Sequence, residues 1–162
     1  MHEYAGDLSK VKMAYIGDGA SNMANSLMLA CKLSGVHMHI ASPEEYAPRK
    51  DLLDMKIGSG SAAWTTSLKE AMDGADFVYT DVWVSMGFEK ESRERMKILE
   101  PYRLDMKMLG HAKPDVKVMH CLPAHRGEEI TDEVMESEHS IVFDEAENRL
   151  HMHKAILCTL FQ

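Results

Sequence analysis

Cysteine is scarce in this sequence of 162 residues. The three cysteines, Cys31, Cys121 and Cys158, are odd in number and form no Cys-x-x-Cys pair. This pattern argues against a disulfide framework and against a zinc site built from cysteine pairs. Together with the 14 methionines, it indicates a reducing compartment, and the expected location is the cytoplasm.

Long apolar runs and a basic excess are missing as well. No stretch approaches the roughly 20 apolar residues that cross a bilayer, and residues 1–10 lack the apolar core of a secretory signal peptide. The formal net charge is -8, whereas binding to phosphate backbones requires a basic face. We therefore expect neither a membrane nor a nucleic acid as a partner.

What is present is an alternation of short β-rich runs with helical segments, in a chain with 45% hydrophobic residues. Strands are expected at 11–16, 37–42, 62–66, 76–83, 116–121 and 140–143, and helices at 21–33, 49–56, 67–73, 89–99, 105–109, 131–136 and 147–161. The alternating residues 37–40 predict a strand with one exposed face or at the edge of the sheet. Repeated strand–helix–strand units imply right-handed crossovers. The expected fold is α/β: a doubly wound parallel sheet, Rossmann-like, in a single domain with three layers, α/β/α.

In doubly wound sheets, ligands bind outside the carboxyl ends of the strands. The sequence after the first expected strand, Gly17-Asp-Gly-Ala-Ser-Asn22, is an incomplete dinucleotide fingerprint. Its third glycine is replaced by Asn22, and no acidic residue follows the second strand to bind a ribose. Two interpretations stay open: Asn22 meets a ligand carboxylate at a helix N-terminus, or Ser21 or Asn22 only caps that helix.

Three other strand ends carry polar residues. In Thr80-Asp-Val-Trp-Val-Ser-Met-Gly87, Asp81 is either the partner of a substrate ammonium or a turn residue. In His120-Cys-Leu-Pro123, Cys121 is a nucleophile, half of a zinc site, or a small buried side chain, and the last reading is the commonest for such a thiol. Arg149 is expected at the start of the last helix, where a cation opposes the helix dipole. That conflict indicates that Arg149 contacts an anion or a carbonyl oxygen.

Four ordered motifs together resemble the second, ornithine-binding domain of ornithine carbamoyltransferases, in the aspartate/ornithine carbamoyltransferase family. The motifs are Gly17-Asp-Gly with Asn22-Met-Ala-Asn-Ser26, Thr80–Gly87, Met119-His-Cys-Leu-Pro-Ala-His-Arg-Gly-Glu-Glu129 and Phe143-Asp-Glu-Ala-Glu-Asn-Arg149. The resemblance is collinear over residues 8–160. It differs at Ser21, where the family usually has a second asparagine, and in residues 49–66, which look shorter than usual.

The resemblance implies a role for each matching residue. The α-amino and α-carboxylate groups of ornithine would be held by Asn22, Asp81, Ser85 and Met86. Cys121 would lie beside the attacking amine. Leu122 would offer its carbonyl to the carbamoyl group, and Arg149 would contact carbamoyl phosphate. Cys121, Asp81 and Arg149 are the expected catalytic residues. Pro123 is expected to keep the chain extended so that the carbonyl of Leu122 faces the ligand. No metal and no organic cofactor are implied.

The sequence shows no counterpart of the family's first domain, which supplies most contacts to carbamoyl phosphate. Residues 1–162 are therefore expected to be the ornithine-binding domain alone, without appreciable activity. Its partners would be ornithine, carbamoyl phosphate through the other domain, and further copies in a homo-oligomer. The apolar residues of helix 147–161 would then lack a partner surface. The alternative is a non-catalytic module that binds an amino acid or another protein.

Overall fold

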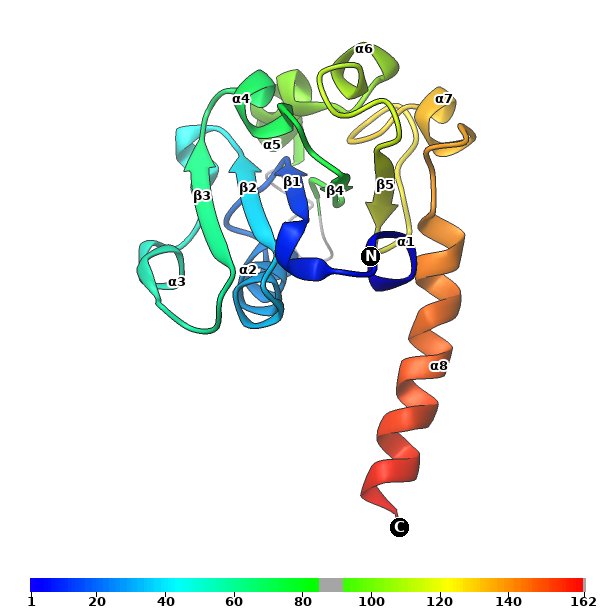
Figure 1. The fold of residues 1–162 in the computed structure, drawn as a ribbon. Helices are drawn as coiled ribbons and strands as arrows, with labels where there is room; N and C mark the ends of the chain where they lie inside the picture. Colours follow the sequence, from blue (N-terminus) through cyan, green and yellow to red (C-terminus); the bar gives the residue numbers. More distant parts are fainter. Residues whose placement is uncertain (85–91, 162) are drawn as a thin grey trace.

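A parallel sheet of five strands forms the centre of the computed structural model, which describes residues 1–84 and 92–161 (Figure 1). The strands are β1 (Lys12–Ile16), β2 (His37–Ala41), β3 (Ser61–Thr65), β4 (Phe77–Thr80) and β5 (Lys117–His120), in the order β3-β2-β1-β4-β5. The chain builds outward from β1 to β3 and then returns to the other side of β1. The strand order therefore reverses between β1 and β4, where doubly wound folds bind their ligands.

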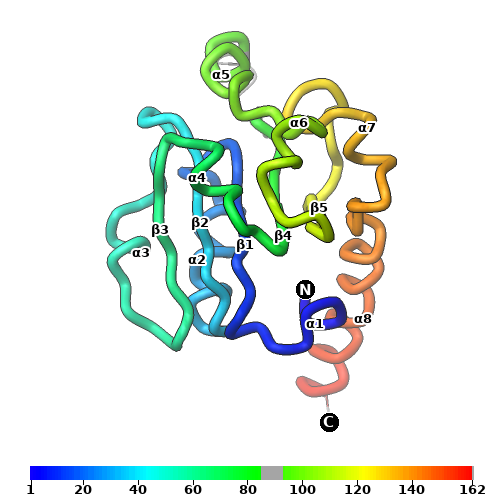
Figure 2. The backbone as a smooth tube through the Cα atoms, turned by 45° about the horizontal axis from the view of Figure 1, so that its top comes forward, coloured from blue at the N-terminus to red at the C-terminus, as the bar shows by residue number. Residues whose placement is uncertain are grey.

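Helices cover both faces of this sheet (Figures 1 and 2). They are α1 (His2–Ala5), α2 (Asn22–Ser34), α3 (Lys50–Asp54), α4 (Leu68–Met72), α5 (Ser92–Leu99), α6 (Met106–Leu109), α7 (Asp132–Met135) and α8 (Val142–Leu160), with short 3-10 turns at Leu8–Lys10, Glu44–Tyr46 and Glu100–Tyr102. Among the described residues, no helix has the combined length and apolarity needed to cross a bilayer. The predicted three-layer α/β/α architecture is confirmed.

The two faces of β1 belong to different halves of the core. Met13 and Tyr15 pack with α2 and α3, whereas Ala14 and Ile16 pack with α4, α6 and α7. All four are fully buried, which explains why β1 reads as a continuous apolar run. β2 is an interior strand between β1 and β3, so the edge position considered for residues 37–40 is wrong.

The strand predicted at 140–143 is also wrong. Ser140 forms a single bridge with Val118, and α8 already begins at Val142. The chain runs beside β5 only long enough for the amide of Val118 to donate to the carbonyl of His139 (2.8 Å) and that of Ile141 to the carbonyl of Val118 (2.9 Å). Apolar, β-branched residues cannot by themselves distinguish a strand from the first turn of a helix. β4, predicted to reach residue 83, ends at Thr80.

The helix α8 continues well beyond the rest of the molecule (Figure 1). Its first turns are held by α1, which lies against it in both views (Figures 1 and 2): the Tyr4 hydroxyl donates to Asp144, and the Asn148 amide donates to Glu3 (3.2 Å). The apolar side chains exposed along α8 are Phe143, Leu150, Met152, Ile156, Leu157 and Leu160, followed by Phe161 after its end. Large exposed apolar patches commonly mark interaction surfaces.

Candidate active site

Two neighbouring strand ends bring Asp81 and Cys121 into contact. β4 and β5 are paired in parallel with Thr80 opposite His120, so the next residues, Asp81 and Cys121, leave the sheet side by side. The Cys121 thiol donates a hydrogen bond to Asp81 Oδ1 (2.9 Å), which also accepts from the amide of Val82 (2.8 Å). Asp81 is buried, with 8% of its surface exposed. A carboxylate with so little water around it is an effective partner for a positively charged group.

The thiol of Cys121 is held in its protonated form. Burial raises the pKa of Cys121 to about 12, and the hydrogen bond to Asp81 and the charges of Asp81 and Glu145 act in the same direction. Since the thiolate is the nucleophilic form of cysteine, this environment does not support covalent catalysis by Cys121. The geometry instead makes the thiol of Cys121 a neutral hydrogen-bond donor to Asp81 at this edge of the sheet.

Arg149 reaches the same point from α8. Its Nη2 donates to the carbonyl oxygen of Cys121 (3.0 Å), and its side chain is otherwise exposed. Because α8 begins at Val142, Arg149 lies in the third turn and not at the N-terminus. The predicted conflict with the helix dipole is therefore wrong, although the expected contact with a carbonyl oxygen is present.

The backbone bends sharply after Cys121. Leu122 has a φ of 56°, in the left-handed region, and the peptide bond between Leu122 and Pro123 is cis. The expectation that Pro123 keeps the chain extended is therefore wrong. The bend is stabilised by His120, whose Nδ1 accepts a hydrogen bond from the amide of Leu122 (2.9 Å).

The ring of His120 is buried and its tautomer follows from its contacts. Because Nδ1 accepts, the proton lies on Nε2, which faces Glu129 Oε1 at 3.1 Å. The same oxygen accepts from the amide of His125 (2.6 Å), while Glu129 Oε2 is buried without a partner among the described atoms. His125, Glu128 and Glu129 are the side chains of the described residues whose ligand atoms lie close enough for a metal ion, within 4.8 Å of one another. Cys121 belongs to no such group of three or more ligand side chains among the described residues.

Asn22 lies at the same edge of the sheet, as the first residue of α2 after β1. Ser21 caps this helix: its hydroxyl accepts from the amide of Ala24 (3.1 Å) and lies 3.0 Å from the hydroxyl of Tyr15. The exposed side chain of Asn22 is therefore not needed as the cap. In the described part of the chain no hydrogen bond joins Asn22 to Asp81, Cys121 or Arg149. Ser85 and Met86 lie outside the described residues.

Arg95 of α5 joins the loops that follow β1 and β4. It forms an ion pair with Asp18, its Nε donates to the carbonyl of Trp83 (3.0 Å), and its guanidinium lies 4.5 Å from the centre of the Tyr46 ring. The side chains of Arg95 and Asp18 are only 11% and 9% exposed. Trp83 is fully buried. The role of Arg95 was not found from the sequence, because the charged segment 89–99 resembles an ordinary solvated helix.

A family model described as "Aspartate/ornithine carbamoyltransferase, Asp/Orn binding domain" matches residues 9–160. The chain belongs to the aspartate/ornithine carbamoyltransferase family. It is 51% identical over 161 residues to an ornithine carbamoyltransferase of Archaeoglobus fulgidus, covering 99% of this chain and 52% of that protein. An ornithine carbamoyltransferase of Methanoculleus marisnigri is 50% identical with the same coverage.

Solved structures of carbamoyltransferases have the same fold. The ornithine carbamoyltransferase of Pyrococcus furiosus gives a TM-score of 0.89 at 45% identity, covering 96% of this chain and 51% of that chain. That of Thermus thermophilus gives 0.87 at 37% identity, covering 99% and 52%. The chain thus spans about half the length of the relatives it matches.

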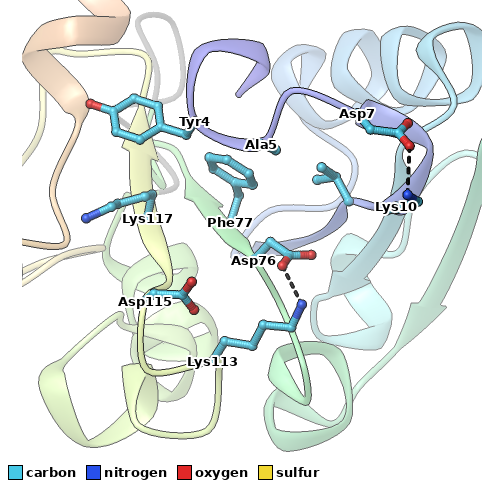
Figure 3. Close-up of a pocket in the computed structure, with 10 residues that line it drawn as sticks. Tyr4, Ala5, Asp7, Lys10, Asp76, Phe77, Lys113, Asp115 and Lys117 are labelled. Atoms are coloured by element: carbon cyan, nitrogen blue, oxygen red, sulfur yellow. Dashed lines mark hydrogen bonds and ion pairs between the residues drawn. The ribbon is translucent and has the colours of Figure 1, made fainter.

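A hollow lies at the opposite, amino-terminal edge of the sheet (Figure 3). It has a volume of about 460 Å³ and contains Phe77 at the start of β4 and Lys117 at the start of β5. Asp76 forms an ion pair with Lys113, and Asp7 lies 3.3 Å from Lys10. Its charged groups are thus largely paired with each other, and it is separate from the site around Cys121.

Proposed function

We propose that this chain is the amino-acid-binding half of an ornithine carbamoyltransferase, with residues 1–162 forming the ornithine-binding domain. The reaction transfers the carbamoyl group of carbamoyl phosphate to the side-chain amine of ornithine and gives citrulline and phosphate. The contact of Cys121 with Asp81 and Arg149 at the carboxyl edge of the sheet carries the proposal. The names of the similar proteins support it. The cytoplasm fits a chain with free cysteines.

The site offers a different interaction to each part of the substrates. Asp81 attracts the cationic α-amino group, with Asn22, Ser85 and Met86 as further ligands of the amino acid. The side-chain amine has a pKa near that of lysine, about 10.4, so it must lose a proton before its lone pair attacks the carbamoyl carbon. The N–C bond then forms, the C–O bond to phosphate breaks, and the attacking nitrogen gives its remaining extra proton to the departing phosphate. The protonated thiol of Cys121 remains a neutral neighbour of the amine.

The cation of Arg149 and the carbonyl of Leu122 face the carbamoyl phosphate in this proposal. Arg149 is already held 3.0 Å from the carbonyl oxygen of Cys121, and its guanidinium is accessible. Donors that are fixed before the reaction stabilise a developing negative charge without the cost of reorganisation. Most contacts to carbamoyl phosphate are expected from the other half of the enzyme.

Calorimetry with ornithine and with norvaline, which lacks the side-chain amine, tests the amino-acid site. The titrations are repeated after addition of the half of the Archaeoglobus fulgidus relative that this chain does not match. Binding together with citrulline formation by the mixture supports the proposal. Binding without activity supports the alternative, a non-catalytic amino-acid-binding module, and absence of binding in both titrations contradicts the proposal.

Replacing Asp81 with asparagine is expected to weaken ornithine binding about 10–100-fold. A hydrogen bond to a charged group contributes about 1.5–3 kcal/mol, and every 1.4 kcal/mol is about tenfold in affinity. Asp115→Asn is the matched control, because it removes the same charge from an exposed position at the amino edge of the sheet. Equal affinities of the D81N and D115N variants for ornithine would exclude Asp81 from the site.

The exposed apolar row of α8 is proposed to contact the other half of the enzyme or a second copy of the chain. Purified alone, the chain is expected to self-associate in sedimentation and to bind a hydrophobic dye. Leu157→Glu is expected to reduce both, whereas Lys154→Glu, a change at another exposed position of α8, leaves them unaltered. A monomer at every concentration without dye binding would contradict this part of the proposal.

A further inference from the structure

We propose that Glu145 is a positioning residue for this site: it fixes the backbone that carries Cys121 and aligns α8 so that Arg149 reaches the Cys121 carbonyl. The inference rests on the proposed function for its catalytic meaning. The contacts of Glu145 with Tyr79 and His120 can be tested by measurements that do not require enzymatic activity. The motif that contains Glu145 had suggested a role only for Arg149.

The carboxylate of Glu145 connects two strands of the sheet. Its Oε1 accepts a hydrogen bond from the hydroxyl of Tyr79 on β4 (2.8 Å), and its Oε2 accepts from the backbone amide of His120 on β5 (3.0 Å). Tyr79 is buried and Glu145 is partly buried. Burial and the nearby charge of Glu145 raise the pKa of Tyr79, so the tyrosine remains a hydrogen-bond donor throughout the physiological range.

The bond to His120 replaces a missing bond of the sheet. Residues 139–141 pair with Val118 in the pattern of a parallel ladder, and in a continuing strand the next donor, the amide of His120, would pair with the carbonyl of Ile141. The chain instead turns into α8, and the Glu145 side chain supplies the acceptor. Because the Glu145 carboxylate takes the place of the Ile141 carbonyl as acceptor, a helix can begin here, directly beside Cys121, without leaving the amide of His120 unpaired.

Glu145 and Arg149 act on consecutive residues from one face of α8. They are four residues apart, which places them on the same side of a helix, one turn from each other. Glu145 accepts from the amide of His120, and Arg149 donates to the carbonyl of Cys121. The two contacts together determine the rotation and height of α8 relative to β5.

The charge of Glu145 also acts on the thiol. Together with burial and Asp81 it raises the pKa of Cys121, so removal of the charge shifts that pKa downward and increases the thiolate fraction at a given alkaline pH. The titratable and charged groups around the thiol come from every neighbouring element. They are Asp81 and Tyr79 of β4 and the loop after it, Tyr15 of β1, His120 of β5, and Glu145 and Arg149 of α8.

The test is the pH dependence of alkylation of Cys121 by iodoacetamide in a Cys158→Ser background. Cys158 is exposed, whereas Cys31 is buried with its pKa raised to about 12, so the remaining accessible thiol is Cys121. Between pH 9 and 10, Glu145→Gln is expected to be alkylated about threefold faster or more than the parent, because the thiolate is the reactive form. Glu147→Gln removes the same charge from an exposed position of α8 and is expected to match the parent. Equal rates for all three proteins would overturn the proposal.

Hydrogen exchange of the His120 amide gives a measurement that does not depend on a variant folding. In the parent this amide is expected to be protected like the other amides of β5, although its acceptor is the side chain of Glu145 and not a strand carbonyl. Exchange as fast as that of exposed loop amides would overturn the proposal. In the enzyme completed with its other half, Glu145→Gln is expected to lower kcat about tenfold and to change KM for ornithine less, since Glu145 touches no substrate. If the parent chain completed with its other half shows no activity, the proposed function is contradicted. The alkylation and exchange results then still decide whether Glu145 is a positioning residue.

Discussion

The 162-residue chain, purified by itself, is expected to form no citrulline above background from ornithine and carbamoyl phosphate. It spans about half the length of its relatives. The candidate site contributes Arg149 as its cation toward carbamoyl phosphate, whereas catalysis of acyl transfer requires several donors directed at the developing oxyanion. Removal of one such donor commonly costs about 10²–10³ in rate. In a preparation that contains these 162 residues alone, the positioning of the second substrate by a phosphate-binding half is also missing.

The same measurement has a positive control. Addition of the unmatched half of the Archaeoglobus fulgidus relative is expected to restore citrulline formation, and Arg149→Met is expected to abolish the restored activity. Lys154→Met, which removes a cation from an exposed position of α8, serves as its matched control. Appreciable activity of the purified chain without the added half would refute the proposed division of the site.

Arg95→Met is expected to lower the free energy of unfolding by about 3–5 kcal/mol, the cost of leaving one charge of a buried ion pair without its partner. The side chain of Asp18 is 9% exposed and would lose its cationic partner. The variant also loses the hydrogen bond to the carbonyl of Trp83 and the contact with the Tyr46 ring. Chemical denaturation monitored by circular dichroism measures the change.

Two further variants separate the buried charge from the general effect of the substitution. Arg49→Met breaks an ion pair with Asp51 in which both side chains are 61% exposed, and such pairs contribute about 0–1 kcal/mol. In the double variant D18N/R95M both charges of this ion pair are removed, so it is expected to be more stable than R95M alone. If R95M and R49M are equally stable, the ion pair between Arg95 and Asp18 does not hold the two loops together.

The sequence predicted the five strands of the parallel sheet because these depend on local patterns, although β4 ends at Thr80 and not at residue 83. β1 is a continuous apolar run followed by Gly17-Asp-Gly19, and β5 leads directly into Cys121. Burial on both faces and the turn residues at the strand ends are visible in such short stretches. The contact between Asp81 and Cys121 then follows from the pairing of β4 with β5.

The errors arose where tertiary contacts decide the local structure. The chain at 140–143 has strand-forming residues, yet the carboxylate of Glu145 takes the hydrogen bond that a longer strand would have made. Leu122 adopts a left-handed φ that the ring of His120 stabilises, whereas a residue before proline is usually extended. Lys32 of α2 also depends on a tertiary contact: it is buried, and its ammonium donates to the carbonyls of Leu52 and Leu53 in α3 and of Met55 just after α3 (2.7, 2.7 and 2.6 Å).

The position of α8 allows it to connect the candidate site around Cys121 mechanically with a protein that contacts the C-terminal part of the helix. A helix of 19 residues measures about 28 Å at a rise of about 1.5 Å per residue, and it bends little over that length. A displacement of its far end is therefore transmitted to the first turns, which carry Arg149. A protein that binds the C-terminal part of α8 would therefore also affect the contact between Arg149 and the carbonyl oxygen of Cys121.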